Sequence, residues 1–147
     1  MRRSFPSPLA SAQAPVAFTL PVRIYWEDTD AGGIVFYANY LKFFERARTE
    51  WLRGLGVGQQ TLHERSGGMF VVSEAALKYH RPARLDDELA VTVRLQHTGQ
   101  ASLLLAQEAL LCGQQLCCEA SIRIGWIDAA RMKPARIPPD VLRLVCP

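Results

Sequence analysis

One stretch of the sequence decides the fold, and it reads Glu27-Asp28-Thr29-Asp30-Ala31-Gly32-Gly33-Ile34-Val35-Phe36-Tyr37-Ala38-Asn39-Tyr40. Alternating apolar and polar residues precede it, which predicts a strand, and apolar residues at helical spacing follow it. The pattern therefore predicts a strand, an acidic turn with two glycines, and then a helix. A carboxylate beside a helix N-terminus lies next to N–H groups that attract negative charge. This is the minimum equipment for hydrolysing an activated acyl group.

The predicted helix runs from about 39 to 55. Its apolar residues recur every three or four positions and give one wide apolar face; they are Tyr40, Leu41, Phe44, Ala47, Trp51 and Leu55. Asn39 can cap its start, and Gly54 or Gly56 can end it. Glu45 and Arg48 stand three positions apart on this helix, a spacing at which they can pair.

Five segments have the pattern of strands. The first covers about 22–27, and the other four cover about 69–80, 89–95, 102–111 and 116–126, with turns at Gly99 and Gly113. A single helix with an apolar face must be covered by the sheet, because it would otherwise stay exposed. The order of elements predicts an α+β domain in which an antiparallel five-stranded sheet wraps around one long central helix.

The chain length of 147 residues suits one domain. We expect a disordered N-terminal tail over 1–15, a folded domain over 16–138 and a C-terminal tail over 139–147. The net charge of +3 comes without a basic run, so nothing indicates a nucleic-acid partner. No apolar stretch is long enough for insertion into a membrane. Pro6, Pro8 and Pro15 interrupt the start, which lacks the apolar core of a signal peptide, so we expect a cytoplasmic protein.

The four cysteines are Cys112, Cys117, Cys118 and Cys146, on or beside apolar stretches. Adjacent Cys117 and Cys118 would point to opposite faces of a strand, which makes them a poor metal pair. We interpret all four as buried thiols of a reducing compartment. The sequence predicts no metal site.

The chain resembles the hotdog-fold acyl-CoA thioesterases, most closely the YbgC group associated with the Tol-Pal envelope system. The resemblance covers roughly 21–138, and these segments carry it: Val22-Arg23-Ile24-Tyr25, Glu27-Asp28-Thr29-Asp30-Ala31-Gly32-Gly33, Ala38-Asn39-Tyr40, Phe44-Glu45-Arg46-Ala47-Arg48-Thr49-Glu50, Pro82-Ala83-Arg84-Leu85-Asp86-Asp87 and Met132-Lys133-Pro134. It implies a hotdog fold with an active site at a dimer interface. The YbgC group usually has His where this chain has Tyr37, whereas the related 4-hydroxybenzoyl-CoA thioesterases have Tyr.

By this resemblance, Asp30 is the catalytic carboxylate, as nucleophile or as general base. Tyr37 belongs to the same site, more for position than for chemistry. Backbone N–H groups near Tyr37 and Ala38 are candidates for polarising the thioester oxygen. Asp28 is either a second acid that orients Asp30 or a solvated turn residue.

The candidate substrate-binding residues are more dispersed. Gly32 and Gly33 let the backbone take a positive φ or approach the ligand closely. Asn39, at the start of the helix, belongs to the same group, and in related enzymes a hydroxyl near Ser102 approaches the site. Arginine and lysine suit the phosphates of CoA, and the candidates are Lys78, Arg81, Arg84, Arg131 and Lys133.

The resemblance therefore implies an acyl-CoA thioesterase that forms free acid and CoA without a metal or redox cofactor. A homodimer or homotetramer is expected, and an acyl carrier protein is a possible alternative donor. The main alternative is a non-catalytic hotdog module that binds acyl-CoA or acyl carrier protein, or serves the cell envelope as a scaffold. A hotdog dehydratase is disfavoured, because such enzymes use a His and the acidic turn has none.

Overall fold

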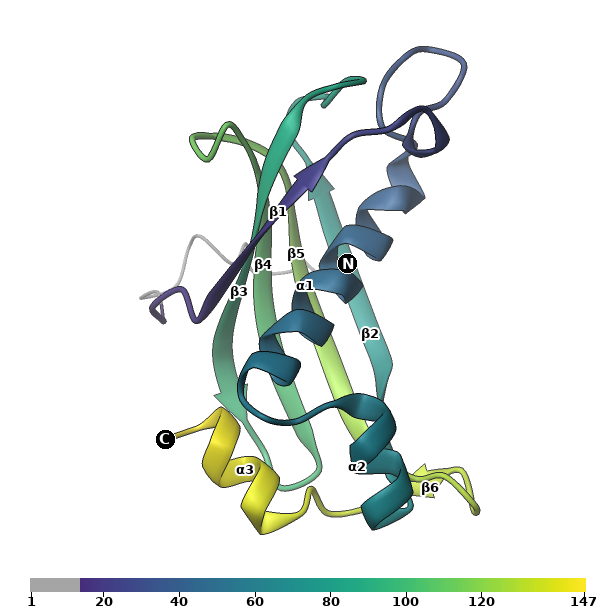
Figure 1. Cartoon of the computed structure of the whole chain (residues 1–147), viewed down its shortest axis with the longest axis vertical. Coiled ribbons are helices and arrows are strands. Elements are labelled where there is room, and N and C mark those ends of the chain that lie inside the picture. The colour runs from purple at the N-terminus through teal and green to yellow at the C-terminus, as the bar shows by residue number, and fades with distance from the viewer. Residues whose placement is uncertain (1–13) are drawn as a thin grey trace, which may run out of the picture.

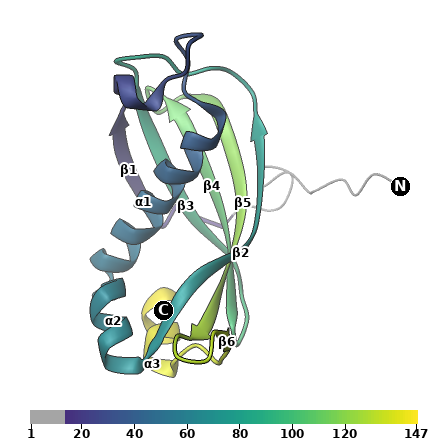
Figure 2. The ribbon, with the colours of Figure 1, turned by 90° about the vertical axis from the view of Figure 1, so that its right-hand side faces the viewer.

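The computed structural model describes residues 14–147; residues 1–13, which hold most of the predicted N-terminal tail, lie outside the described residues. A curved antiparallel sheet wraps around one long helix, α1 (Figures 1 and 2). This confirms the predicted α+β hotdog architecture. The strands are β1 (Phe18–Arg23), β2 (Gly68–Tyr79), β3 (Glu88–Thr98), β4 (Ser102–Leu111), β5 (Gln115–Asp128) and the short β6 (Lys133–Pro134). The helices are α1 (Tyr40–Gly54), α2 (Gln59–Ser66) and α3 (Pro139–Val145), with 3₁₀ turns at Trp26–Asp28 and Tyr37–Asn39.

The strand order is β1-β3-β4-β5-β2, every neighbouring pair is antiparallel, and β6 pairs with the end of β5. Each of the pairings β2–β5, β3–β4 and β4–β5 contains one register shift. Such irregularities increase the local twist, which helps the sheet to curl around the helix. β1 starts earlier than the sequence pattern predicts, and the chain leaves the sheet at Arg23, before the acidic turn.

Helix α1 buries its apolar face against the sheet. Phe43, Phe44 and Ala47 have no exposed surface, and Trp51 is also buried. Leu41, predicted to lie on this face, is 41% exposed. Phe43 replaces it, because it lies three and four positions from Tyr40 and Ala47 and so shares their side of the helix. Within residues 14–147, no helix is both long and apolar enough to cross a membrane.

A buried polar group joins α1 to the middle of the sheet. Arg48 Nη1 donates to Gln107 Oε1 at 3.0 Å, and Gln107 Nε2 donates to the carbonyl of Phe44 at 3.1 Å. Glu45, expected to pair with Arg48, accepts from the Thr49 hydroxyl. Burial lowers the pKa of Arg48, and the nearby Glu45 charge opposes this shift. Arg48 therefore faces the core rather than the solvent.

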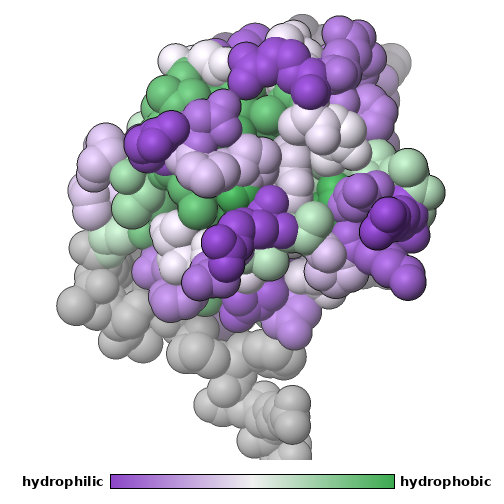
Figure 3. Space-filling view, turned by 90° about the horizontal axis from the view of Figure 1, so that it is seen from below, coloured by the Kyte–Doolittle hydropathy of each residue, from purple (hydrophilic) through white to green (hydrophobic). Residues whose placement is uncertain are grey.

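The segment 139–147, expected as a tail, forms α3 over most of its length, and Val141 and Val145 are buried. Arg65 of α2 pairs with Asp140 of α3 at 3.2 Å. Helices α2 and α3 thus close the lower end of the molecule, where hydrophobic patches lie between hydrophilic residues (Figure 3). Pro139 at the first turn suits a helix start, which composition alone obscured.

The cysteines divide into two pairs. Cys117 and Cys118 are buried in β5, as predicted, but Cys112 and Cys146 are exposed, so the prediction of four buried thiols is wrong for these two. Cys112 occupies the β4–β5 turn with φ +51°, and Cys146 follows the end of α3. Both positions lie beyond the strands and helices that form the core.

Candidate active site

The acidic turn closes on itself as a tight loop at the upper end of the molecule (Figure 1). Thr29 and Val35 form an antiparallel bridge, the Asp30 N–H donates to the Ile34 carbonyl at 2.9 Å, and the Gly33 N–H donates to the Asp30 carbonyl at 3.0 Å. Gly33 has φ +75°, which confirms the predicted need for a positive φ in this turn. The loop therefore holds its shape through its own backbone.

Asp30 lies exposed at the start of this loop. Its Oδ1 accepts the Gly32 N–H at 2.8 Å. A Cβ placed on Gly32 would lie 3.2 Å from the same oxygen, so glycine lets the turn tighten around the carboxylate. The carboxylate is thus oriented by one backbone bond and still accessible from the solvent.

Asp28, two residues earlier, has a different environment. It is only 5% exposed, its Oδ1 accepts from Asn39 Nδ2 at 2.7 Å, and its Oδ2 accepts the Tyr25 N–H at 2.8 Å. Asp28 is therefore not a solvated turn residue, and both of its carboxylate oxygens accept bonds from residues other than Asp30. It fastens the end of the first strand to the start of α1.

This contact also changes the interpretation of Asn39. Its side chain makes no capping bond to α1, because its amide is used by Asp28. Asn39 is buried, and its own N–H donates to the Phe36 carbonyl at 2.8 Å. Asn39 thus occupies the predicted N-cap position, but the helix start is held by a side-chain bond across the turn and not by the predicted capping bond.

The 3₁₀ turn Tyr37–Asn39 leads into α1 and carries the candidate oxyanion donors. The N–H groups of Tyr37 and Ala38 precede the helix, and no acceptor for them is found within residues 14–147. Such groups at a helix start are available to an anion. The Tyr37 ring is 64% exposed, and its carbonyl accepts the Tyr79 hydroxyl at 2.8 Å.

Tyr79 was not identified from the sequence. It is the last residue of β2, and its ring contacts those of Tyr37 and Tyr40 with centroid distances of 6.4 and 5.8 Å. The alternation of residues in the strand gave no sign of a bond to a residue 42 positions away. Burial raises the pKa of Tyr79, so its hydroxyl keeps its proton at neutral pH.

The thiols of Cys117 and Cys118, on β5 beside Tyr79, are poor nucleophiles. Burial, together with the neighbouring Cys117 and Glu119, raises the pKa of Cys118 to about 12. Burial also raises the pKa of Cys117. Because the thiolate is the reactive form, both groups stay inert at neutral pH. Within the described part of the chain, no group of three or more His, Cys, Asp or Glu side chains could hold a metal ion.

Two of the predicted cationic residues lie in the segment that follows β2. Ile34 and Arg84 form a backbone bridge, and the Val35 N–H donates to the Ala83 carbonyl at 2.9 Å, so Arg84 flanks the acidic loop. Arg81 is exposed, and its Nη1 donates to Gln115 at 3.2 Å. The fold therefore brings Arg84 beside the acidic loop, whereas the Arg81 side chain is bound to the first residue of β5.

Other predicted residues lie at the opposite end of the sheet in the same chain. Ser102 pairs with Gly125 on β5, whereas Tyr79 pairs with Cys118. Seven positions of β5 (125 − 118) separate them, or about 23 Å at roughly 3.3 Å per residue. Ser102 accepts a bond from Arg123 Nη1 at 3.4 Å, and Arg131 and Lys133 lie beyond the end of β5. One chain does not bring these residues to Asp30.

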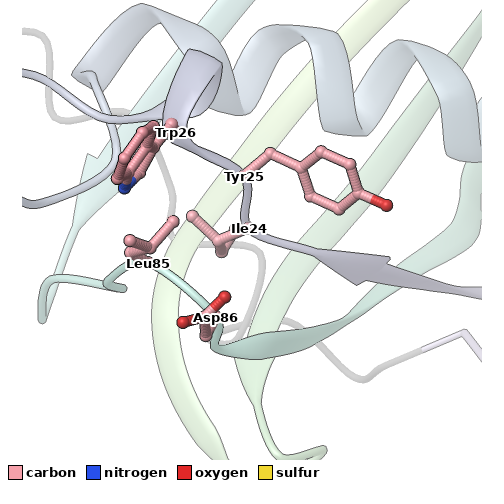
Figure 4. Close-up of a pocket in the computed structure, with 5 residues that line it drawn as sticks. All are labelled: Ile24, Tyr25, Trp26, Leu85 and Asp86. Carbon is pink, nitrogen blue, oxygen red and sulfur yellow. The ribbon is translucent and has the colours of Figure 1, made fainter.

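A cavity of about 430 Å³ opens on the β1 side of the acidic turn. Ile24, Tyr25, Trp26, Leu85 and Asp86 line it; Trp26 and Leu85 stand side by side, and the Tyr25 ring points away from them (Figure 4). Trp26 is 80% exposed. The lining does not include Asp30, so this cavity is separate from the carboxylate that the loop presents.

The chain is similar to known thioesterases in both sequence and fold. Residues 24–145 match the family described as the thioesterase-like superfamily. The acyl-CoA thioesterase YbgC of Haemophilus influenzae is 44% identical over 84% of this chain and 90% of its own length. The chain belongs to this superfamily and, within it, to the YbgC family.

A second related protein and a solved structure support this assignment. The acyl-CoA thioester hydrolase YbgC of an Escherichia coli strain is 39% identical over 85% of this chain and 92% of its own length. The crystal structure of a probable thioesterase from Bartonella henselae superposes with a TM-score of 0.76 at 34% identity, covering 82% of this chain and 98% of that one. The resemblance inferred from the acidic turn is therefore confirmed over nearly the whole domain.

Proposed function

We propose that this protein is an acyl-CoA thioester hydrolase in which Asp30 is the catalytic carboxylate. The observation that carries the proposal is the loop geometry: an exposed, oriented carboxylate at one end and available N–H groups at the start of α1 at the other. The names of the YbgC relatives support the reaction and the class of substrate.

The reaction can follow two routes with the same residues. In the first, Asp30 attacks the thioester carbonyl, CoA leaves as thiolate, and water hydrolyses the resulting anhydride. In the second, Asp30 takes a proton from a water that attacks the carbonyl, and CoA leaves from the tetrahedral intermediate. Both develop negative charge on the carbonyl oxygen, which the N–H groups of Tyr37 and Ala38 stabilise.

We also propose that the complete site needs a second copy of the chain. Strand β2 forms one edge of the sheet, and Val72, 50% exposed, lies near its middle. Pairing two β2 edges antiparallel would cover both. It would place the start of one β2 beside the end of the other. The end with Ser102, Arg131 and Lys133 of the partner would then approach the Asp30 end of this chain, where these residues, with Arg81 and Arg84, could meet the CoA moiety.

The same proposal includes a cytoplasmic location and a homodimer or homotetramer as the active form. It takes CoA esters as substrates, with acyl carrier protein as the alternative donor. Tyr37 contributes position, and Gly32 and Gly33 keep the loop close to the substrate. A size-exclusion experiment that found a fully active monomer would contradict the shared site.

The direct test measures thiol release from butyryl-CoA, palmitoyl-CoA and 4-hydroxybenzoyl-CoA. We expect the native protein to hydrolyse at least one ester, and Asp30→Asn to lose a hundredfold or more in kcat, about the size expected for a catalytic acid–base group. Asp86→Asn is the matched control, because Asp86 is also exposed and its φ of +70° suits asparagine. CoA binding without turnover of any ester would instead favour a binding module.

A further inference from the structure

The hydroxyl of Tyr79 is the only side-chain donor that the described residues place on the backbone of the Tyr37–Asn39 turn. It comes from the end of β2, which β5 holds in register up to the Tyr79–Cys118 pair. The ring is 48% exposed and packs edge-on against Tyr37 and Tyr40. A rigid strand therefore reaches the turn through a single hydrogen bond of 2.8 Å.

Peptide geometry gives this bond a consequence. Each peptide unit is planar, and in the usual trans form its N–H points away from its C=O. The Phe36 carbonyl accepts from the Asn39 N–H at 2.8 Å, which fixes the peptide that carries the Tyr37 N–H. The Tyr37 carbonyl accepts from Tyr79, which fixes the next peptide and with it the direction of the Ala38 N–H.

We propose that Tyr79 is a positioning residue: through the Tyr37 carbonyl, its hydroxyl keeps the Ala38 N–H directed at the oxygen of the bound thioester. This inference rests on the proposed function. Tyr79 acts through the backbone of the turn and takes no part in proton transfer. Without the hydroxyl, the peptide between Tyr37 and Ala38 turns more freely, and the oxyanion loses a preorganised donor.

The raised pKa of Tyr79, caused chiefly by burial, fits this role. A hydroxyl whose pKa lies above its ordinary value of 10.0 keeps its proton, and can donate to a carbonyl, at neutral and mildly alkaline pH. The contribution of the bond should therefore not change with pH in this range. A general acid at this position would instead add an ionisation to the pH profile.

The first test compares Tyr79→Phe with Tyr25→Phe. Both substitutions remove only a hydroxyl. Tyr25 is 62% exposed and lies between β1 and the acidic turn. For the fastest ester of the panel, we expect Tyr79→Phe to lower kcat by about 3- to 10-fold, the range of one net hydrogen bond, with KM changed less than about twofold. The shape of the pH–rate profile should stay the same, and Tyr25→Phe should behave as the native protein.

The second test observes the donor itself. In the Asp30→Asn background, which slows turnover, the carbonyl stretching frequency of the bound ester is measured by isotope-edited infrared spectroscopy. We expect adding Tyr79→Phe to move this frequency towards that of the free ester, because the carbonyl is less polarised. A structural defect alone would lower the melting temperature without this selective shift.

The outcomes separate the two proposals. Lower kcat, an unchanged pH profile and the frequency shift support the positioning role. An active native enzyme with an unaffected Tyr79→Phe variant, or with an altered pH profile, overturns the positioning role and leaves the proposed function standing. A native protein that hydrolyses no ester overturns both.

Discussion

The helix entrance and the acidic loop use aspartate in opposite ways; by helix entrance we mean the turn Tyr37–Asn39 together with the Asp28 side chain bound to it. In the helix entrance, Asp28 is buried and accepts two hydrogen bonds, which fasten Tyr25 and Asn39 together. In the loop, Asp30 is exposed and accepts one bond from its own turn. Burial thus distinguishes two aspartates only two positions apart, and we propose that Asp28 serves stability and Asp30 chemistry.

The physical reason lies in solvation. A buried carboxylate loses its hydration, and it is tolerated only when hydrogen bonds replace the lost water. Asp28 meets this condition with a side-chain amide and a backbone N–H. Asp30 keeps access to the solvent, so a substrate or a water can reach it. The rigid entrance therefore supports an accessible loop, as a preorganised site requires.

Of the substitutions that test this difference between Asp28 and Asp30, Asp28→Ala is expected to lower stability most. The substitution leaves the Asn39 amide and the Tyr25 N–H without their acceptor, and a buried polar group left unsatisfied costs about 1–3 kcal/mol. We expect the free energy of unfolding in urea to fall by about 2–3 kcal/mol. Asp30→Ala is the control and should change it by less than about 0.5 kcal/mol. Equal losses in the two variants would contradict the division of roles.

Gly33→Ala is expected to have the next largest effect. Alanine at φ +75° costs about 1–2 kcal/mol, because its Cβ crowds the backbone in the left-handed region. Gly54→Ala is a control of opposite sign: Gly54 lies in α1 with open space at its Cβ position, and alanine there favours the helix by up to about 1 kcal/mol. Urea unfolding of both variants checks this, and a neutral Gly33→Ala would show that the loop relaxes easily.

A smaller effect on stability is expected from Cys118→Ala, which removes a buried thiol of β5. The pKa of Cys118 is raised from 9.0 to about 12 in the folded protein, chiefly by burial. The unfolded state therefore loses this proton first as the pH rises above 9, and stability falls from there towards the folded pKa. The slope is at most about 1.4 kcal/mol per pH unit. Unfolding measured between about pH 8 and about pH 10.5 should show a smaller slope for Cys118→Ala.

Cys112→Ala provides the comparison for that measurement, because Cys112 is exposed in the β4–β5 turn. Its slope should match that of the native protein. If both variants keep the native slope, the burial of Cys118 does not control stability at high pH.

Much of the fold could be predicted from the sequence because its signals are local. The period of α1 and the alternation in β3 and β5 depend on neighbouring residues, and the glycine needed at Gly33 follows from turn geometry. The bond of Asn39 to Asp28 and that of Tyr79 to Tyr37 join distant segments, so no periodicity reports them. The helical ending of the chain was hidden by its prolines, although Pro139 suits a helix start.

The candidate site was predictable to the same extent. Asp30, Gly32 and Gly33 lie together because they are adjacent in the chain. Ser102 lies at the far end of the sheet. Its distance from Asp30 depends on how the strands pair and on what a second copy contributes. A single sequence reports neither of these.

The most direct test of the central claim measures kcat and urea unfolding in parallel for Asp30→Asn and Asp28→Ala. The account predicts that Asp30→Asn loses a hundredfold or more in kcat while its free energy of unfolding stays within about 0.5 kcal/mol of the native value. Asp28→Ala should show the loss of stability. An Asp30→Asn variant that hydrolyses acyl-CoA at the native rate would contradict the account.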